Sequence, residues 1–290
     1  MSTWNPLTPA EAHIIEHHGT EPKFSGEYDS HYLNGVYICR RCNAPLYRSL
    51  DKFKSGCGWP SFDDEISGAV KRLPDPDGRR IEIRCQACDG HLGHVFSGEH
   101  HTDKNLRHCV NSLSIRFVNI ATLFEQINHG QLPFDYIIVA GGCFWGVEYF
   151  FEQEPGVIAT SVGYTGGQPD HPTYEQVCTG KTGHAEAVAV FFNPTITSTE
   201  KLYALFFDIH DPSQVDGQGP DLGTQYRSAI FYRNNDQQAV AQQALKKLIK
   251  PATQLHSLAP FWLAEAYHQH YCSYRKHAPS CHYKRSAAKS

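Results

Sequence analysis

The chain has 290 residues, more than one typical domain of roughly 100–150 residues, so we expect two domains. Its apolar fraction of 40% and charged fraction of 19% are those of a folded globular protein and exclude a disordered chain. The net charge of -4 argues against a nucleic-acid binder, and the lack of an apolar run of about 20 residues argues against a membrane-spanning protein.

The first residues, MSTWNPLTPAEAHIIEHH, show neither the basic flank nor the apolar core of a secretory signal. We therefore expect a cytoplasmic protein. The chain carries 10 Cys. In a reducing compartment, cysteines at motif spacing indicate metal ligands or redox catalysis more often than structural disulfides.

Short runs rich in β-branched and aromatic residues predict strands in the first 118 residues. These runs are GVYIC (35–39), RRIEIRC (79–85), LGHVF (92–96) and NSLSIRFVN (111–119). A short helical pattern, IATLFEQI, follows within 119–134, where we place the linker between the domains. The first domain, 1–118, is therefore expected to be mostly β.

Strands and helices alternate in 135–290, which predicts an α/β or α+β domain with a mixed sheet. The predicted strands are YIIVA (136–140), EAVAVFF (186–192) and SAIFY (228–232), and the predicted helices are 143–153, 199–207 and 236–250. No internal repeat relates the two halves, so we expect two unrelated folds.

Two C-x-x-C pairs in the first half indicate a metal site: Cys39 with Cys42, and Cys85 with Cys88. Four thiolates form the closed tetrahedral shell of a structural zinc ion, which contributes directly to folding. Iron also suits four sulfur ligands. Ordinary reduced thiols and a zinc-bearing nucleic-acid module are the alternatives, and the acidic charge disfavours the second.

Two further cysteines of this half lie outside these pairs. Cys57 is in the glycine-bracketed GCGWP, Cys109 enters a predicted strand in LRHCVNS, and HLGHVF lies between them. A nucleophilic thiol needs nearby cations or donors to lower its pKa below about 8.5. Arg107, His91 and His94 are candidates, provided that the fold brings them to the sulfur.

CGWPSF, the two C-x-x-C pairs, HLGHVF and R-x-CVNS, in this order over about 5–118, resemble methionine-R-sulfoxide reductase, the B type. The resemblance implies that Cys109 attacks the sulfoxide, that Cys57 resolves the product, and that Trp59 packs against the substrate methyl group. At His108 the family has Tyr or Phe, a departure that we expect to affect only pocket detail. The residues implied to hold the sulfoxide oxygen through water, or to deliver protons, are His91, His94 and Asn111.

In the second half, GGCFWG places Cys143 at the predicted start of a helix, directly after a buried strand. Unpaired backbone N–H groups and the helix dipole favour a thiolate there. Phe144 and Trp145 offer an apolar wall for a small thioether-like group. The alternative is a small residue that only fills the strand–helix corner.

YTGG, PTY, GHAE and DLGTQYRS follow GCFWG in order, and over about 134–281 they resemble methionine-S-sulfoxide reductase, the A type. The resemblance implies that Cys143 is the nucleophile and Glu186 the acid that protonates the sulfoxide oxygen. Glu186 then needs a pKa raised by burial. The residues implied to donate to the same oxygen or to lie nearby are Tyr174, Tyr226 and Asp221.

The A type recycles its nucleophile through a cysteine in the C-terminal tail. Cys281 is our first choice for this resolving thiol, and Cys272, where the family usually has leucine, is the second. Cys178 is expected to be structural. A second metal site is the less favoured reading of the tail residues His268, His270, Cys272, His277, Cys281 and His282.

These resemblances imply a fused enzyme that reduces R epimers in its N-terminal domain and S epimers in its C-terminal domain, one enzyme type per epimer. The implied substrates are oxidised proteins or peptides and free methionine sulfoxide. Each nucleophile would become a sulfenic acid, then an intramolecular disulfide that thioredoxin reduces. We expect structural Zn2+ but no organic cofactor, since no flavin or nicotinamide fingerprint is visible. The alternatives are a general disulfide oxidoreductase or peroxidase and a zinc-dependent binding adaptor.

Overall fold

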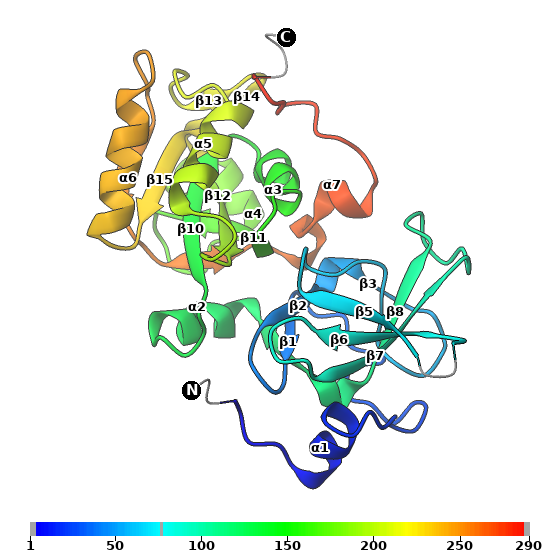
Figure 1. The fold of residues 1–290 in the computed structure, drawn as a ribbon. Helices are drawn as coiled ribbons and strands as arrows, with labels where there is room; N and C mark the ends of the chain where they lie inside the picture. The colour runs from blue at the N-terminus through cyan, green and yellow to red at the C-terminus, as the bar shows by residue number, and fades with distance from the viewer. Residues whose placement is uncertain (1–3, 76–77, 287–290) are drawn as a thin grey trace. The chain divides into compact units, whose positions relative to one another are not determined.

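The computed structural model describes residues 4–75 and 78–286. The chain divides into two compact units, with the boundary between Leu132 and Pro133. Figure 1 shows the mostly-β first unit from blue to cyan-green and the α/β second unit from green to red. Within the two described stretches, no helix has the length and apolar character needed to span a membrane.

The first unit is built on two antiparallel sheets, as its β-branched and aromatic runs predict. β1 (Gly35–Cys39) pairs with β2 (Pro45–Arg48) on one side and β9 (Ile115–Asn119) on the other. The second sheet has six strands in the order β3-β4-β8-β7-β6-β5. They are β3 (Lys52–Phe53), β4 (Ser61–Phe62), β5 (Val70–Pro74), β6 (Ile81–Cys85), β7 (His91–Ser97) and β8 (Leu106–Val110).

The predicted strand 111–119 begins later than its sequence pattern indicates. Ser112–Ser114 form a 3-10 turn, η2, and β9 starts only at Ile115. The Glu21 carboxylate accepts the backbone N–H of Ser112 at 2.6 Å. A donor used in this way is no longer available to a strand ladder, which explains the late start.

Helices in this unit have identifiable caps. α1 (Pro9–Ile15) begins after Thr8 in a reciprocal capping box, and a 3-10 turn, η1 (Ser49–Asp51), follows β2. α2 (Ile120–Asn128) is the helix predicted within 119–134. Asn119 caps it, and its face of Ile120, Leu123 and Ile127 is buried, with contacts to β1 and β9.

The second unit is built on a six-stranded mixed sheet with the order β16-β15-β10-β12-β11-β17. β15 and β16 are parallel and the other pairs are antiparallel, so the predicted mixed sheet is confirmed. Every residue of β11 and β12 is buried, which accounts for the nearly continuous apolar run of β12. The strands are β10 (Asp135–Gly141), β11 (Val157–Thr165), β12 (Ala185–Phe192), β15 (Ser228–Tyr232), β16 (Gln254–Ser257) and β17 (Phe261–Leu263), with a separate pair β13 (Gly217–Gln218) and β14 (Asp221–Leu222).

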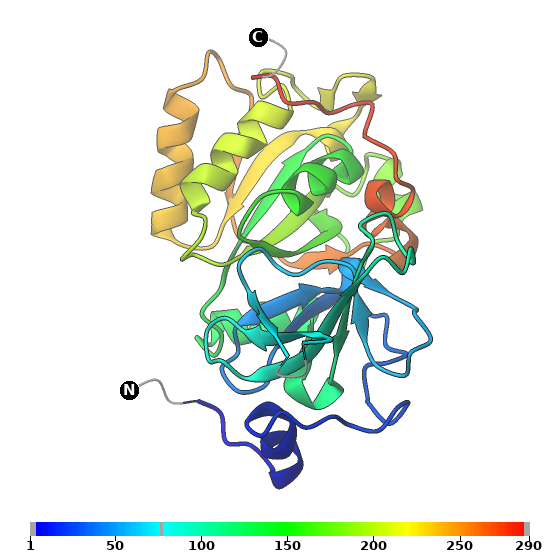
Figure 2. The same ribbon diagram turned by 45° about the vertical axis from the view of Figure 1, so that its right-hand side comes forward.

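Helices of this unit pack against the sheet, and Figure 2 shows α5 and α6 side by side along it. The predicted helix 236–250 ends early, at Lys246. Lys250 has a φ of 49° and precedes Pro251, and the residue before proline is disfavoured in the helical region, so the helix cannot continue to this position. The helical segments are α3 (Phe144–Glu152), α4 (Tyr174–Cys178), α5 (Thr199–Ile209), η3 (Thr224–Tyr226), α6 (Asn235–Lys246), η4 (Ala266–His268) and α7 (Tyr271–Tyr274).

Candidate active sites and metal site

Two matching turns bring four cysteine sulfurs together in the first unit. Cys39 ends β1 and Cys85 ends β6. The four sulfurs lie within 4.8 Å of one another, with 3.6 Å from Cys39 to Cys88 and 3.6 Å from Cys42 to Cys85. A zinc ion bonded at about 2.3 Å to four sulfurs spaces them by about 3.8 Å. The donor set therefore fits such an ion.

The backbone supports the same arrangement at both turns. The carbonyl of Cys39 accepts from Asn43 at 2.9 Å, and the carbonyl of Cys85 accepts from Asp89 at 3.0 Å. Asn43 and Asp89 have φ values of 61° and 63°, in the left-handed region that Asn and Asp tolerate well. Since β1 and β6 belong to different sheets, a metal ion held here would tie the two sheets of the unit together.

Cys57 and Cys109 face each other, with 3.7 Å between their sulfur atoms. Cys109 lies on β8 opposite Ser61 of β4, and Cys57 lies on the loop before β4. Gly58 in this loop has a φ of 93°, and a Cβ there would lie 3.0 Å from the Lys23 side chain. Glycine is therefore required for the loop to bring the second thiol to the first.

The two thiols share a proton and titrate as a pair. The hydrogen bond between their sulfurs lowers the pKa of Cys57 and raises that of Cys109. The hydroxyls of Ser55 and Ser61 also favour the thiolate of Cys57. Arg107, one of the predicted cations, opposes the rise in the pKa of Cys109. The pair therefore holds one negative charge more readily than an isolated thiol does.

A cavity of about 90 Å³ opens over Cys109. The predicted residues Trp59, His94 and Asn111 line it, together with Phe96. Cys57 and His91 are not among the lining residues. The cavity thus offers an apolar wall of Trp59 and Phe96 around one of the two sulfurs. The polar side chains that line it are Thr20, Arg80, His94 and Asn111.

Glu21 holds two of these lining side chains, a role that the sequence analysis missed. Its backbone carbonyl accepts the Trp59 indole N–H at 3.1 Å, and its backbone N–H donates to Asn111 Oδ1 at 3.0 Å. Asn111 also donates to the Leu92 carbonyl at 3.1 Å. Glu21 lies in Gly-Thr-Glu-Pro (19–22), within the stretch that resembles the B type, but that short motif does not indicate which side chains it contacts.

The register between β6, β7 and β8 places three residues of the site side by side on neighbouring strands. Glu82 on β6 lies opposite His94 on β7, which in turn lies opposite Cys109 on β8. Residues opposite each other in neighbouring strands point to the same face. His94 also contacts Asp75 at 3.2 Å through Nε2.

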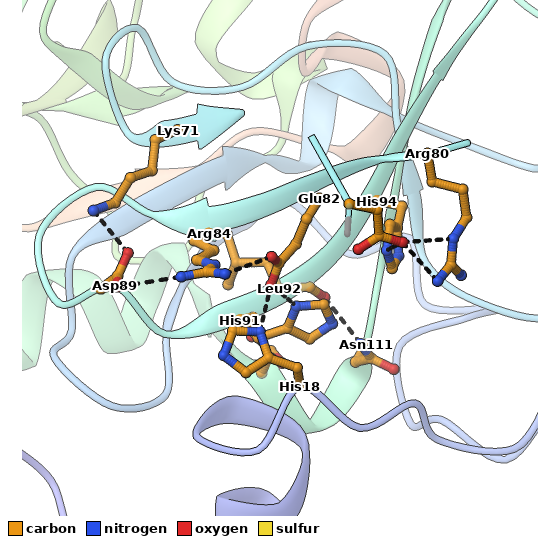
Figure 3. Close-up of polar contacts among 12 residues, drawn as sticks. His18, Lys71, Arg80, Glu82, Arg84, Asp89, His91, Leu92, His94 and Asn111 are labelled. Atoms are coloured by element: carbon orange, nitrogen blue, oxygen red, sulfur yellow. Dashed lines mark hydrogen bonds and ion pairs between the residues drawn. The ribbon is translucent and has the colours of Figure 1, made fainter. Parts of the chain in front are cut away.

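Glu82 joins two histidines from distant parts of the chain (Figure 3). Its Oε1 lies 2.6 Å from Nδ1 of His18 and 2.6 Å from Nδ1 of His91, and its Oε2 accepts from Arg84 at 2.7 Å. Although burial opposes the charged form, these donors lower the pKa of Glu82 to about 2. A carboxylate can only accept, so Nδ1 of His91 carries the proton and its Nε2 is unprotonated.

His91 is buried and its Nε2 has no hydrogen-bond partner among the described residues. Burial lowers the pKa of His91, which keeps the ring neutral. Its ring lies 5.7 Å from that of His94, centroid to centroid. His91 therefore does not line the cavity itself but lies next to His94, which does.

His108 does not belong to the pocket, so the expectation that it affects pocket detail is wrong. It is fully buried between the Tyr47 hydroxyl at 3.2 Å and the Glu65 carboxylate at 3.1 Å. Alternation along β8 explains this, because His108 and Cys109 are consecutive and point to opposite faces of the sheet.

In the second unit, Cys143 is the N-cap residue of α3, directly after β10. Gly142 before it has a φ of 97°, which lets the chain turn from strand to helix. The Glu186 carboxylate on β12 accepts the Phe144 N–H at 3.1 Å and is only 2% exposed. Burial raises the pKa of Glu186 to about 8, so the carboxyl group is mostly neutral at pH 7.

The other polar residues predicted for this site lie near Cys143 and Glu186 and come from other elements of the unit. Tyr174 opens α4, Tyr226 ends η3 and Asp221 begins β14. Burial raises the pKa of both tyrosines, and the charge of Glu186 raises it further. They therefore remain phenols that can donate. Cys178, expected to be structural, is exposed on α4 and its sulfur contacts Tyr174.

The two aromatic residues after Cys143 have different surroundings. Phe144 is 1% exposed and belongs to the core of the unit. Trp145 is partly exposed and stacks on Tyr271 with 3.7 Å between ring centroids. Its indole N–H donates to His268 at 3.1 Å. Trp145 thus presents an apolar surface near the nucleophile, whereas Phe144 supports it from inside.

The C-terminal tail reaches the same place. Cys143, Cys272 and Cys281 line one cavity of about 580 Å³, together with Trp145. Cys281 forms a hydrogen bond with Cys143, which lowers the pKa of Cys281 and raises that of Cys143. Cys272 is 8% exposed on α7, and burial raises its pKa to about 11.

A buried acid–base network attaches this tail to α3. Glu148 accepts the backbone N–H of His270 at 2.7 Å, and Glu152 contacts Nδ1 of the same histidine at 2.5 Å. Ser273 of α7 donates to Glu152. Among the described residues, the tail histidines and cysteines do not gather as one metal-binding group, and only His270 joins such a group, with these two glutamates.

The chain matches two protein-family models in sequence. Residues 7–119 match the SelR domain, and residues 135–290 match the peptide methionine sulfoxide reductase model. The second match covers more than half of the chain.

Individual relatives match each half. Peptide methionine sulfoxide reductase MsrA of Methanosarcina acetivorans is 50% identical over 139 residues, 46% of this chain and 74% of that protein. Peptide methionine sulfoxide reductase B5 of Oryza sativa is 55% identical over 112 residues, 38% of this chain and 82% of that protein. Among solved structures, reduced Mxr1 of Saccharomyces cerevisiae is 33% identical with a TM-score of 0.49, covering 53% of this chain and 93% of that one.

Proposed function

The chain belongs to the peptide methionine sulfoxide reductases, with a B-type domain followed by an A-type domain, and we propose that each domain reduces one sulfoxide epimer. We assign the R epimer to the first domain (1–118) and the S epimer to the second (135–290), joined by 119–134. The first observation in favour is that each domain holds its own pair of facing cysteines.

In the first domain, Cys109 is the proposed nucleophile because its sulfur lies in the cavity and that of Cys57 does not. Because the hydrogen bond between the sulfurs keeps the proton on Cys109 in the resting pair, that proton first passes to Cys57. The Cys109 thiolate then attacks the sulfoxide sulfur while the oxygen gains a proton. The hydroxyl group then moves from the substrate sulfur to the Cys109 sulfur as the bond between the two sulfurs breaks, so methionine leaves with its sulfur reduced by two electrons and Cys109 becomes a sulfenic acid. Trp59 would pack against the substrate methyl group. The proposed roles of holding the oxygen, directly or through water, and of supplying protons fall to His94, Asn111 and His91.

Cys57 then completes the half-reaction as the resolving thiol. Its thiolate attacks the Cys109 sulfur, the S–O bond breaks, and hydroxide leaves as water after taking up a proton. The 3.7 Å between the two sulfurs requires little movement for this bond to form. The lowered pKa of Cys57 favours the attacking thiolate at neutral pH.

The second domain uses different groups for the same chemistry. Cys143 would attack the sulfoxide sulfur, and Glu186 would protonate the oxygen as the S–O bond of the substrate weakens. Its raised pKa gives it a proton to donate at neutral pH. Tyr174 and Tyr226 would donate hydrogen bonds to the oxygen, with Asp221 nearby. Trp145, supported by the buried Phe144, would contact the apolar part of the substrate.

Cys281 is the proposed resolving thiol of this domain, because it already forms a hydrogen bond with Cys143. Cys272 lines the same cavity and is the second candidate. The high pKa of buried Cys272 makes it the weaker nucleophile at neutral pH. An external dithiol protein of the thioredoxin class would reduce either disulfide by exchange.

Two further assignments complete the proposal. Zn2+ would be held by Cys39, Cys42, Cys85 and Cys88 and would supply folding free energy to the first domain. We propose oxidised proteins or peptides and free methionine sulfoxide as substrates, and the cytoplasm as the location.

The observation that carries the two-site proposal is the presence of one facing thiol pair in each unit. Its test is an assay with dithiothreitol on separated R and S epimers, comparing wild type with Cys109→Ser and Cys143→Ser. We expect Cys109→Ser to lose only R turnover and Cys143→Ser only S turnover. Retention of both activities in either variant, or reduction of insulin disulfides in place of sulfoxides, would favour a general disulfide oxidoreductase.

A further inference from the structure

The residue after Cys281 is a histidine that the chemistry proposed above does not use. His282 is 2% exposed although it lies near the end of the described chain. Its ring packs against the turn that carries Cys143. A Cβ at Gly142 would lie 3.2 Å from His282 Cε1, and a Cβ at Gly146 would overlap the ring. The glycines on both sides of Cys143 thus make room for this imidazole.

The contacts of His282 determine its tautomer. Nε2 lies 2.7 Å from the backbone oxygen of Gly141, and a carbonyl oxygen can only accept a hydrogen bond. Nε2 therefore carries the proton in the neutral ring. The other nitrogen, Nδ1, is then an unprotonated acceptor, and it lies 3.1 Å from the sulfur of Cys281. A base is thus placed directly on the resolving thiol.

We propose that His282 is a catalytic residue of the resolving step in the second domain, an inference that rests on the proposed role of Cys281. When Cys143 attacks as a thiolate, its proton passes to its hydrogen-bond partner Cys281, which is therefore a thiol at the resolving step. Nδ1 takes that proton from Cys281, and the resulting thiolate attacks the sulfur of the Cys143 sulfenic acid. The S–S bond forms and the S–O bond breaks. Nδ1–H returns the proton to the departing hydroxide, which leaves as water, and the imidazole is neutral again.

Two other titratable groups lie near His282. His210 is buried, and burial lowers its pKa to about 3, so it brings no positive charge. Asp221 contacts the Cys281 thiol and lies close enough to His282 for the two charges to interact. After the hydrogen bond from Cys143, the contact with His282 also lowers the pKa of Cys281.

The variant His282→Gln removes the basic nitrogen at this position while keeping a hydrogen-bond donor for the Gly141 carbonyl. The glutamine amide has a donor that can still reach the Gly141 carbonyl, but it has no basic nitrogen for the Cys281 thiol. His277→Gln is the matched control, because His277 lines the same cavity and lies four residues before Cys281, but its exposed ring forms no described hydrogen bond with either cysteine. Methionine release from the S epimer reports in each variant that the second domain is folded, and R-epimer turnover reports the same of the first domain.

The experiment is a single turnover of the S epimer by the reduced full-length protein. Methionine release measures the first step, and dimedone labelling with thiol counting measures the sulfenic acid and the disulfide. We expect His282→Gln to release methionine at the wild-type rate, to accumulate dimedone-reactive sulfenic acid, and to form the disulfide about 100-fold more slowly. His277→Gln should behave as wild type.

A second variant tests the chemistry directly. His282→Ala leaves a gap where the ring was, and added imidazole should restore disulfide formation in this variant, whereas it should not change the wild-type rate expected of His277→Ala. Wild-type disulfide formation in His282→Gln would overturn the proposal. The proposal would also be overturned if methionine release in His282→Gln slowed as much as disulfide formation. Failure of imidazole to restore disulfide formation in His282→Ala would overturn it as well, because each result indicates a structural role.

The role of Cys281 is checked separately from that of His282. Cys281→Ser should release one methionine per chain and retain the sulfenic acid on Cys143. If Cys281→Ser forms an intramolecular disulfide at the wild-type rate, the assignment of the resolving thiol is wrong, whatever His282→Gln does. If Cys281→Ser behaves as expected and His282→Gln is normal, only the inference about His282 is wrong.

Discussion

Glu186 is expected to set the alkaline limit of S-epimer reduction. Burial raises its pKa from the ordinary 4.5 to about 8. At 1.36 kcal/mol per pKa unit, this rise favours the neutral acid over the carboxylate by about 5 kcal/mol. A site that needs a proton donor therefore has one in about nine of ten molecules at pH 7, whereas an exposed glutamate would supply one in fewer than about one in a hundred.

The pH dependence follows from the sign of this shift. A raised pKa means that the stability contributed by the neutral acid is fully present below about pH 4.5 and is lost as the pH rises through about 8. The rate of methionine release should fall in the same range, about tenfold per pH unit above 8, because the donor disappears. Glu186→Gln cannot ionise, so it should lose this alkaline limb and also release methionine about 100-fold more slowly, or worse.

The assay is rapid-quench measurement of methionine release from the S epimer between about pH 6 and pH 10. The R epimer, reduced by the other domain of the same chain, is the control, and Glu186→Gln should not alter its profile. The reasoning is refuted if the wild type shows no fall near pH 8, or if Glu186→Gln keeps a limb with the same midpoint. Either result would assign the proton to another group.

Three further predictions concern the rest of the molecule. Chelation of the metal, or Cys85→Ser, should lower the melting temperature of the first domain and abolish R turnover while S turnover persists; metal analysis and calorimetry check this. Glu82→Gln should reduce R turnover about 10–100-fold, because it removes the charge that fixes the His91 tautomer, and unchanged R kinetics would contradict this role. Cys178→Ser should leave both activities within about twofold of wild type, because this exposed thiol has no proposed step, and a steady-state assay on both epimers is sufficient.

The local parts of both sites were predictable from the sequence. The C-x-x-C spacing predicts the four-sulfur cluster because two residues between cysteines fit one tight turn, and Asn43 and Asp89 complete that turn in both cases. The helix start at Cys143 follows from the change from a buried strand through two glycines to a helical pattern.

The parts that depend on strand register were not predictable in the same way. Glu82 meets His91 because β6 and β7 pair with an irregularity between Ile83 and Arg84, which no local pattern reveals. His18 reaches the same carboxylate from 64 residues away. The orientation of His108 could have been predicted, since alternation along a strand places neighbours of Cys109 on the opposite face.

The two domains surround their resolving thiols with different groups, and this difference is itself testable. Cys57 is contacted by the hydroxyls of Ser55 and Ser61, neither of which is a base, whereas Cys281 is contacted by an imidazole nitrogen. The hydroxyls of Ser55 and Ser61 both favour the thiolate of Cys57, so one of them remains when the other is lost. Ser61→Ala should therefore slow disulfide formation in an R-epimer single turnover by less than about tenfold, the effect of one hydrogen bond. Slowing as severe as that expected for His282→Gln would show instead that a serine carries the proton in the first domain.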